Sequence, residues 1–264
     1  MDIAPPTDPL AAVSHPDPYA YYAELATAER PERDDRLGLW IVANPTHVAQ
    51  LLRHPDARVV PPAGAPRGFA EYARFNEGER HARLRAEVIE RMATVSLDEP
   101  AIALDDLDAF VENYALYALV RDLRSNVKGD ILFQSCDAVR ALIGNALVAF
   151  ERDPSLGVES AVARALAHDP PVHNTRREMA ADVEIGGATL RAGDTALVVL
   201  VTMTFGTGPH ACPGDSLATR IATMALQRLL GAGFHPRKPV GYLPRPNVRI
   251  PLFDASGGTS LPPT

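Results

Sequence analysis

The sequence predicts a mainly α-helical protein with a few short strands arranged in hairpins. Long stretches of the chain place apolar residues at helical spacing, whereas the runs with strand-like alternation are short. The 24 prolines divide the 264 residues into many short segments, and hydrophobic residues make up 46% of the chain, enough for a sizeable core. We therefore expect one domain, with an N-terminal helix, strand and loop region (1–75), a helical core (76–168) and a C-terminal region of hairpins and a final helix (169–264).

The N-terminal region combines short helices with one strand. Tyr19–Glu29 is Ala-rich with apolar residues at helical spacing, which predicts a short helix. Leu37–Val42 is too short and too rich in strand-forming residues for a helix, so it predicts a strand. Pro45–Leu52 predicts a second helix, because proline at the first helical position loses no hydrogen bond. The prolines of Val59–Gly68 predict a loop.

Long helices dominate the middle of the chain. Helical periodicity predicts four of them, over about 77–94, 104–120, 130–152 and 158–168.

Short strands and one final helix follow the prolines at 170 and 171. Val183–Leu190 alternates around a Gly-Gly turn, which predicts a hairpin, and Thr195–Thr204 is another apolar, β-branched run. Asp215–Leu230 carries apolar residues on one face and ends before glycines, which predicts a helix. The Pro-rich residues beyond Gly233 are expected to be irregular.

Charge and composition exclude several classes of protein. Lys and Arg total 26 against 33 Asp and Glu, and this acidic balance argues against nucleic-acid binding, which needs a clustered basic surface. We expect no membrane-spanning helix, since no apolar stretch reaches about 18 residues. The start of the chain lacks a secretion signal, and two cysteines make no disulfide framework. A cytoplasmic protein is therefore expected.

One glycine-rich stretch, Phe205–Gly214, carries the main chemical signal. Its glycines indicate a tight bend of the backbone. Cys212 lies just before the Asp215 helix, whose N-terminus favours a thiolate over a thiol. A thiolate on such a loop, with His210 nearby, suits a large planar metal cofactor. A structural cysteine in a glycine turn, or a zinc site with His210, are the alternatives.

This stretch resembles the cysteine-ligand loop of the cytochromes P450, F-G-x-G-x-H-x-C-x-G, at every defined position. The resemblance implies a reduced cytochrome P450-like fold that binds haem b (iron protoporphyrin IX), with Cys212 as the iron ligand. It also implies cofactor contacts from the other motif residues, namely Phe205, Gly206, Gly208, His210 and Gly214.

Two further segments are similar to the family's sites for the haem propionates. His81 and Arg85 match an H-x-x-x-R pair and lie one helical turn apart on one face. Residues 169–176 resemble the D-P-P-V segment, in which Arg176 takes the place of a propionate-binding arginine. Cationic and donor side chains at these positions suit two carboxylates. Without the cysteine loop, the basic helix would be read as a solvated surface.

The chain also departs from the family pattern. It is shorter, and the stretches before Leu142–Asn145 and between Thr195 and Phe205 lack room for the covering helices and the usual meander. Alignment of the central helix keeps an acid at Asp137 but places Ala138 where the family has an oxygen-handling threonine. The loss of this hydroxyl argues against ordinary proton delivery during oxygenation. Asp137 and Ala138 are therefore the candidate catalytic positions.

The resemblance implies a haem-thiolate protein that oxidises a small organic substrate, either as a monooxygenase served by a ferredoxin and its reductase or with peroxide. A non-catalytic haem-binding accessory or sensor protein, and a haem enzyme of non-redox chemistry, are the alternatives. Cys136, on the presumed distal helix, is read as a small buried hydrophobe or as a second ligand or redox group. An open haem face predicts a homo-oligomer, or a lid formed by Leu104–Val120.

Overall fold

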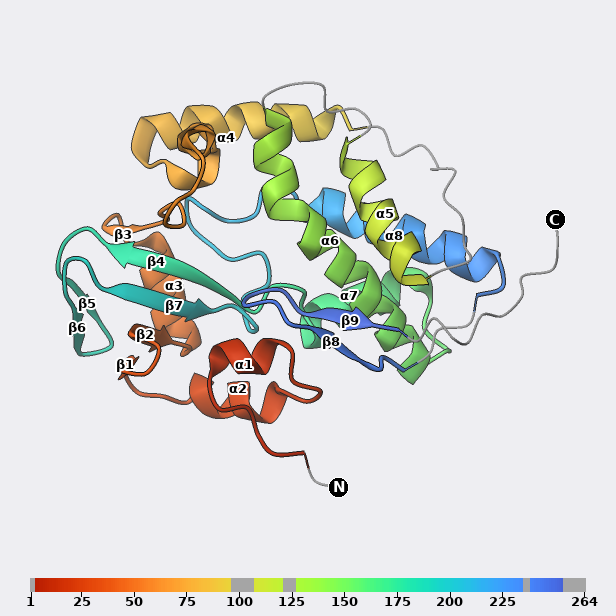
Figure 1. The fold of residues 1–264 in the computed structure, drawn as a ribbon, viewed down its shortest axis with the longest axis horizontal. Coiled ribbons are helices and arrows are strands. Elements are labelled where there is room, and N and C mark those ends of the chain that lie inside the picture. Colours follow the sequence, from red (N-terminus) through yellow and green to blue (C-terminus); the bar gives the residue numbers. More distant parts are fainter. Residues whose placement is uncertain (1–2, 96–106, 121–126, 235–237, 254–264) are drawn as a thin grey trace. The chain divides into compact units, whose positions relative to one another are not determined.

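The computed structural model describes residues 3–95, 107–120, 127–234 and 238–253 (Figure 1). The chain forms two units, and each is assembled from two separate stretches of sequence. The first unit contains residues 1–88 and 172–213, and the second contains residues 89–171 and 214–264. The joins fall after residues 88, 171 and 213, whereas the sequence predicted one domain with regions that end at residues 75 and 168.

The first unit contains most of the strands. Its helices and 3₁₀ turns are α1 (Pro9–Val13), α2 (Tyr19–Ala26), α3 (Pro45–Arg53), η1 (Arg67–Glu71), η2 (Ala73–Phe75) and the first part of α4 (Gly78–Ala93). Its strands are β1 (Glu32–Asp34), β2 (Leu39–Val42), β3 (Ala57–Arg58), β4 (Asn174–Met179), β5 (Val183–Ile185), β6 (Ala188–Leu190) and β7 (Thr195–Val199).

A five-stranded sheet with the order β1-β2-β7-β4-β3 forms the centre of this unit (Figure 1). β2 pairs with β7 in parallel, and the other neighbours are antiparallel. β4 is held between β7 and β3, so its side chains alternate between two faces of a paired strand. This alternation decides which residues of β4 reach the candidate site.

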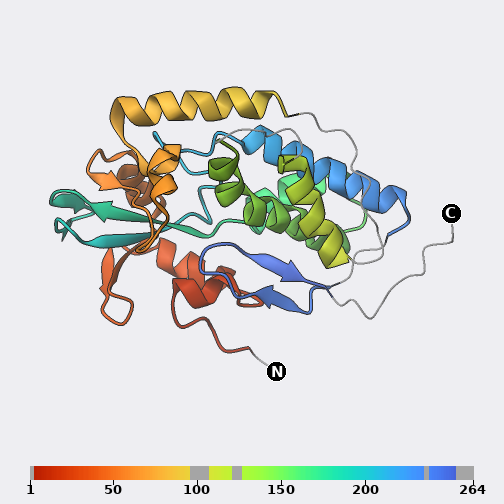
Figure 2. The ribbon, with the colours of Figure 1, turned by 45° about the horizontal axis from the view of Figure 1, so that its top comes forward.

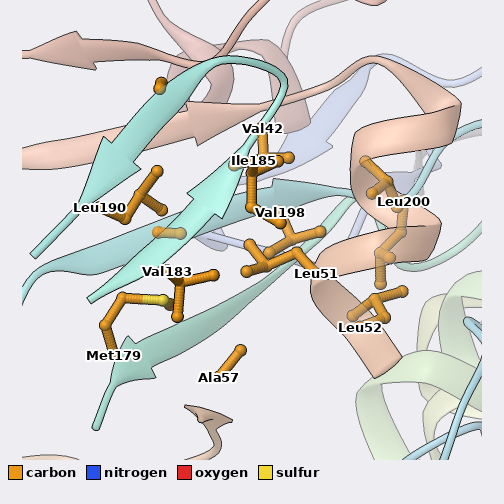
Figure 3. Packing of buried hydrophobic residues seen from close by; sticks show 13 residues of the cluster. Val42, Leu51, Leu52, Ala57, Met179, Val183, Ile185, Leu190, Val198 and Leu200 are labelled. Atoms are coloured by element: carbon orange, nitrogen blue, oxygen red, sulfur yellow. The ribbon is translucent and has the colours of Figure 1, made fainter. Parts of the chain in front are cut away.

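The main core of the first unit lies between α3, the sheet and the β5–β6 hairpin. Figure 3 shows Leu51 of α3 beside Val198 of β7 and Ile185 of the hairpin, and all three are buried. Burial of each such side chain contributes about 1.5–3 kcal/mol. α3 begins where Asn44 accepts a hydrogen bond from the Thr46 backbone N–H (3.0 Å), with Pro45 at the first helical position.

A second cluster in this unit packs α2 next to the sheet. Tyr22 and Val199 are both buried in it. The Tyr22 hydroxyl is 3.0 Å from Nδ1 of the buried His173. This polar contact gives the tyrosine hydroxyl a partner where water does not reach it.

The second unit is mainly helical. It contains α5 (Leu107–Val120), α6 (Val127–Arg152), α7 (Val158–His168), α8 (Asp215–Gly231) and the strands β8 (Gly241–Leu243) and β9 (Ile250–Leu252), together with the end of α4. Helix α6 packs against α5, α7 and α8 (Figure 2). A Cβ atom added to Gly144 of α6 would lie 2.6 Å from the Pro251 side chain, so glycine permits a close approach of α6 to β9. None of the described helices is long and apolar enough to cross a membrane.

A buried ion pair joins the end of α7 to the C-terminal hairpin. Arg249 Nε lies 2.8 Å from Asp169 Oδ1, and the Arg249 guanidinium lies 3.5 Å from the centre of the Tyr242 ring. Asn145 of α6 donates to the Asp169 carbonyl (2.8 Å). Breaking such a buried pair from one side costs about 3–5 kcal/mol. The hairpin is therefore an integral part of the second unit.

The mainly α-helical fold with short strands is confirmed, and the predicted long helices occur as α4 to α8. The expectation that the C-terminal residues are irregular is wrong, because β8 and β9 pair antiparallel. Proline cannot donate a backbone hydrogen bond to a sheet, so Pro251 argues against a strand when the sequence is considered locally, and β9 was not predicted.

Candidate functional site

The loop from Phe205 to Pro213 is held in a tight conformation within the first unit. Phe205 has a φ angle of 69°, a left-handed conformation that is uncommon for a residue other than glycine. Its carbonyl accepts a hydrogen bond from the Cys212 backbone N–H (2.8 Å), which closes the loop. Cys212 itself is exposed. A residue other than glycine held in this strained region, as Phe205 is, is a feature of functional loops.

Glycine is required where this loop meets α3. Gly206 and Gly208 have φ angles of 68° and 77°. A Cβ atom at Gly208 would lie 2.7 Å from the Leu52 carbonyl oxygen. The adjacent Arg53 donates to the Thr207 hydroxyl (2.6 Å). These contacts fix the cysteine loop against the C-terminal end of α3.

His210, on the same loop, meets residues at the start of α4. Its Nε2 lies 3.0 Å from a carboxylate oxygen of Glu77, and only 8% of the His210 side chain is exposed. The ring of His81, which is buried, is centred 4.2 Å from the His210 ring. Two residues that the sequence predicted separately, His81 and His210, therefore lie side by side.

The ionisable groups of this cluster shift one another's pKa values. Burial raises the pKa of Glu77, but the hydrogen bond and charge of His210 outweigh it, and the pKa is lowered overall. Burial, followed by the charges of His210 and Arg85, lowers the pKa of His81. Arg85 is half-buried, one turn after His81 on α4. The cluster thus gathers basic side chains around one carboxylate.

β4 contributes Arg177 to this cluster, and Arg176 does not join it. Arg176 is exposed, whereas its neighbour Arg177 is 4% exposed. Successive side chains of a strand point to opposite faces, and Arg177 shares the buried face with Met179. The role that the resemblance gave to Arg176 therefore suits Arg177.

Arg177 is a buried cation with an incomplete set of partners. Its Nη1 donates to the Thr175 hydroxyl (3.1 Å) and to the Arg176 carbonyl (2.8 Å). Its Nε, although buried, has no hydrogen-bond partner within the described part of the chain. Burial and the nearby Arg74 lower its pKa to about 10, while Glu77 acts in the opposite direction. A buried guanidinium with an unused donor fits an anionic group bound beside it.

The second unit holds the other predicted positions. Asp137, on α6, forms an ion pair with Arg245 (3.2 Å). Ala138 and Cys136 are half-buried, and burial and Asp137 raise the pKa of the Cys136 thiol. Gly214 is buried and caps the N-terminus of α8.

Comparisons with known proteins support the fold. No protein-family model matches the chain, and no curated protein matches it. Among solved structures, P450 RauA in complex with a biosynthetic intermediate of aurachin RE is 19% identical, with a TM-score of 0.62 and coverage of 93% of this chain and 96% of that chain. Cytochrome P450 CYP109Q5 from Chondromyces apiculatus is 18% identical, with a TM-score of 0.62 and coverage of 90% and 95%. The chain has the cytochrome P450 fold.

CalO2 gives a similar result, with 20% identity, a TM-score of 0.65 and coverage of 96% of this chain and 100% of that chain. The P450 fold explains why the cysteine loop, the start of α4 and strand β4 are built into one unit although they are distant in the sequence. It confirms the fold that the motifs around His81, Asp169 and Cys212 implied.

Two residues of the site were missed at the level of sequence. Arg177 could have been found from strand alternation, since it lies two residues before the apolar Met179. Glu77 gave a weaker signal, a carboxylate four residues before His81. Its contact with His210 depends on tertiary structure, so no local pattern predicts it.

Proposed function

We propose that this P450-fold chain is a haem-thiolate protein that binds haem b and oxidises a small organic substrate. The observation that carries the proposal is the presence, in one unit, of an exposed cysteine on a tight glycine-rich loop and a cluster of basic side chains, of which His81 and Arg177 are buried. Cys212 would be the iron ligand. Phe205, Gly206 and Gly208 would shape its loop, and Gly214 would begin the helix that follows.

The residues of the cluster fit the two propionates of haem. Arg177 has an unused buried donor within the described residues. The charge of Glu77 acts on Arg177, and the same Glu77 contacts His210, whose ring lies beside that of His81. Cys212 would supply the thiolate that holds the haem iron. We therefore assign the propionate role to Arg177 in place of Arg176.

When bound through a thiolate, haem supplies oxidation chemistry that favours cleavage of the O–O bond. This chain's residues would hold the cofactor, present the thiolate and neutralise the propionates. Electrons would come from a partner such as a ferredoxin and its reductase, or the oxidant would be peroxide. The peroxide route is supported by Ala138, which has no hydroxyl, and by Asp137, whose carboxylate is paired with Arg245.

The same two positions support a second candidate, a haem-binding accessory or sensor protein without catalysis. Everything retained in the sequence concerns holding haem, whereas the proton-handling hydroxyl is missing at Ala138. Turnover of candidate substrates by the haem-loaded chain, with peroxide and separately with an electron donor, distinguishes the candidates. Oxidised product in either regime supports the enzyme, and none in both supports the accessory role.

The assignment of Cys212 is tested by the spectrum of the reduced, carbon-monoxide-bound protein. The parent should give the red-shifted band of a thiolate ligand, and Cys212→Ala should lose it while its far-UV helicity stays unchanged. Cys136→Ala is the matched control and should keep the band. A Cys212→Ala protein that retained the band would contradict the assignment.

A further inference from the structure

Glu77 occupies a central place in the cation cluster of the first unit. Its carboxylate lies 3.0 Å from His210 Nε2, and it also accepts a hydrogen bond from the Val59 backbone N–H (3.4 Å). Its charge acts on both His81 and Arg177. One of the groups assigned to the haem propionates, His210, therefore contacts this carboxylate, and its charge acts on two more.

The contact with His210 uses a donor that a propionate would need. An imidazole ring has two nitrogens, and Glu77 engages Nε2. The His210 side chain is nearly buried, whereas 35% of the Glu77 side chain is exposed. Glu77 can thus turn toward water more easily than His210 can, which permits exchange of one carboxylate for another.

We propose that Glu77 is an internal stand-in for a porphyrin carboxylate: it neutralises the cation cluster before haem binds and competes with a propionate for His210. This inference rests on the proposed function and adds a regulatory element to the same site. Glu77 is then a positioning and specificity residue that sets how tightly a dianionic porphyrin is held.

Two physical arguments support this competition. Buried cations without a counterion are strongly destabilising, so a chain that must fold before its cofactor arrives gains from an internal carboxylate. The same carboxylate repels an incoming anion and must give up its hydrogen bond, which weakens binding of that anion. Removal of the charge should therefore stabilise the complex and destabilise the ligand-free chain.

The test measures binding of iron-free protoporphyrin IX to the full ligand-free chain by the change in porphyrin fluorescence. This probe carries both carboxylates but needs no iron ligand, so Cys212 does not decide the result. Glu77→Gln should bind it about tenfold more tightly than the parent, since one repulsive charge is removed. Glu79→Gln, which changes an exposed carboxylate in the first turn of α4, is the matched control and should leave affinity unchanged.

Protoporphyrin IX dimethyl ester separates charge from shape. It lacks the carboxylates, so Glu77→Gln and the parent should bind it equally. Chemical unfolding adds a second readout, in which ligand-free Glu77→Gln should unfold at lower denaturant concentration than the parent. Glu77→Asp keeps the charge but shortens the side chain, so its stability should stay close to that of the parent. Its affinity for protoporphyrin IX tests whether the contact with His210 matters.

The outcomes are distinct. Unchanged or weaker binding of protoporphyrin IX by Glu77→Gln would overturn the stand-in role and make Glu77 a residue that merely orients His210. Equal gains for the diacid and its ester would also overturn it, because the effect would not be electrostatic. A parent chain that bound neither iron-free porphyrin nor haem itself would refute the proposed haem function, and this inference with it.

Discussion

Arg177 lies where water hardly reaches it, and its guanidinium has too few partners for a purely structural residue. Burial lowers its pKa to about 10, which shows that the surroundings disfavour its charge. A buried guanidinium of this kind is explained if a bound ligand supplies an anionic group that pairs with it. The neighbouring Arg176 has the same chemistry but is exposed on the other face of β4. The two arginines therefore form a matched pair for an experiment.

We predict that Arg177→Met weakens haem retention by about 1.5–3 kcal/mol, the size of a hydrogen bond to a charged group. The ligand-free variant should unfold no more easily than the parent, since it loses a poorly compensated buried charge and keeps the volume. Transfer of haem to an excess of a haem-binding acceptor protein measures retention, and denaturant unfolding measures stability. Arg176→Met should match the parent in both, and a loss of equal size in this control would contradict the assignment.

The His81 and Glu77 pair makes stability depend on pH. The pKa of His81 is lowered by burial, His210 and Arg85 from its usual 6.5, so below that pH the unfolded chain takes up a proton more readily than the folded chain. The free energy of unfolding should fall as the pH drops through this range. The lowered pKa of Glu77 adds a further loss below its usual 4.5, through the same imbalance.

Denaturant unfolding of the ligand-free chain at a series of pH values checks this prediction. The parent should lose stability on acidification from about pH 7 to about pH 5.5, and His81→Asn should give a flatter curve over that interval. The groups that act on His81 here are Glu77, Arg85 and His210. A variant curve as steep as that of the parent would show that another group titrates.

At the scale of elements, the cysteine loop depends on its approach to α3. We predict that Gly208→Ala destabilises the chain by about 1–3 kcal/mol, because it combines a positive φ with a clash against the Leu52 carbonyl. Gly206→Ala has the same strain in φ but nothing within 4 Å of the added Cβ, so it should cost less. Thermal unfolding of both variants decides this, and equal losses would mean that the close approach is unimportant.

Local pattern predicted the helices well and the strands less well. The amphipathic periods of α4, α7 and α8 and the proline at the start of α3 are local signals, and their bounds agree with expectation within a few residues. β4 was missed, since its polar residues gain strand structure only by pairing with β7 and β3. β8 and β9 were missed for the same reason, and the Asp169–Arg249 ion pair that ties them to α7 joins distant residues.

The residues of the candidate site also differ in whether local sequence or tertiary structure reveals them. His81, Arg85, His210 and Cys212 followed from motifs, because each motif fixes spacing within one element. Glu77 and Arg177 came from tertiary structure, which sets the face of β4 and the approach of the cysteine loop to α4.

At the scale of the whole molecule, one described helix, α5, lies between α4 and α6 in the sequence, where the family resemblance implies several covering helices. The apolar residues of α5 are already committed, since Phe110, Val111 and Tyr114 are buried within the second unit. Burial of each of these large side chains contributes about 1.5–3 kcal/mol to the second unit. Because these apolar residues are engaged within their own unit, a second copy of the chain is favoured over α5 as the cover of an open haem face.

We therefore predict that the haem-loaded chain forms a homo-oligomer at micromolar concentration, measured by sedimentation velocity. Ile89, on α4 four residues after Arg85, has 45% of its surface exposed, so a second copy that packs on this helix would cover it. Ile89→Glu should shift the chain toward the monomer, while Ile3→Glu, at an exposed apolar residue near the N-terminus, should leave association unchanged. A strictly monomeric parent whose haem was shielded from a soluble quencher would contradict this prediction, because the chain would then cover the cofactor by itself.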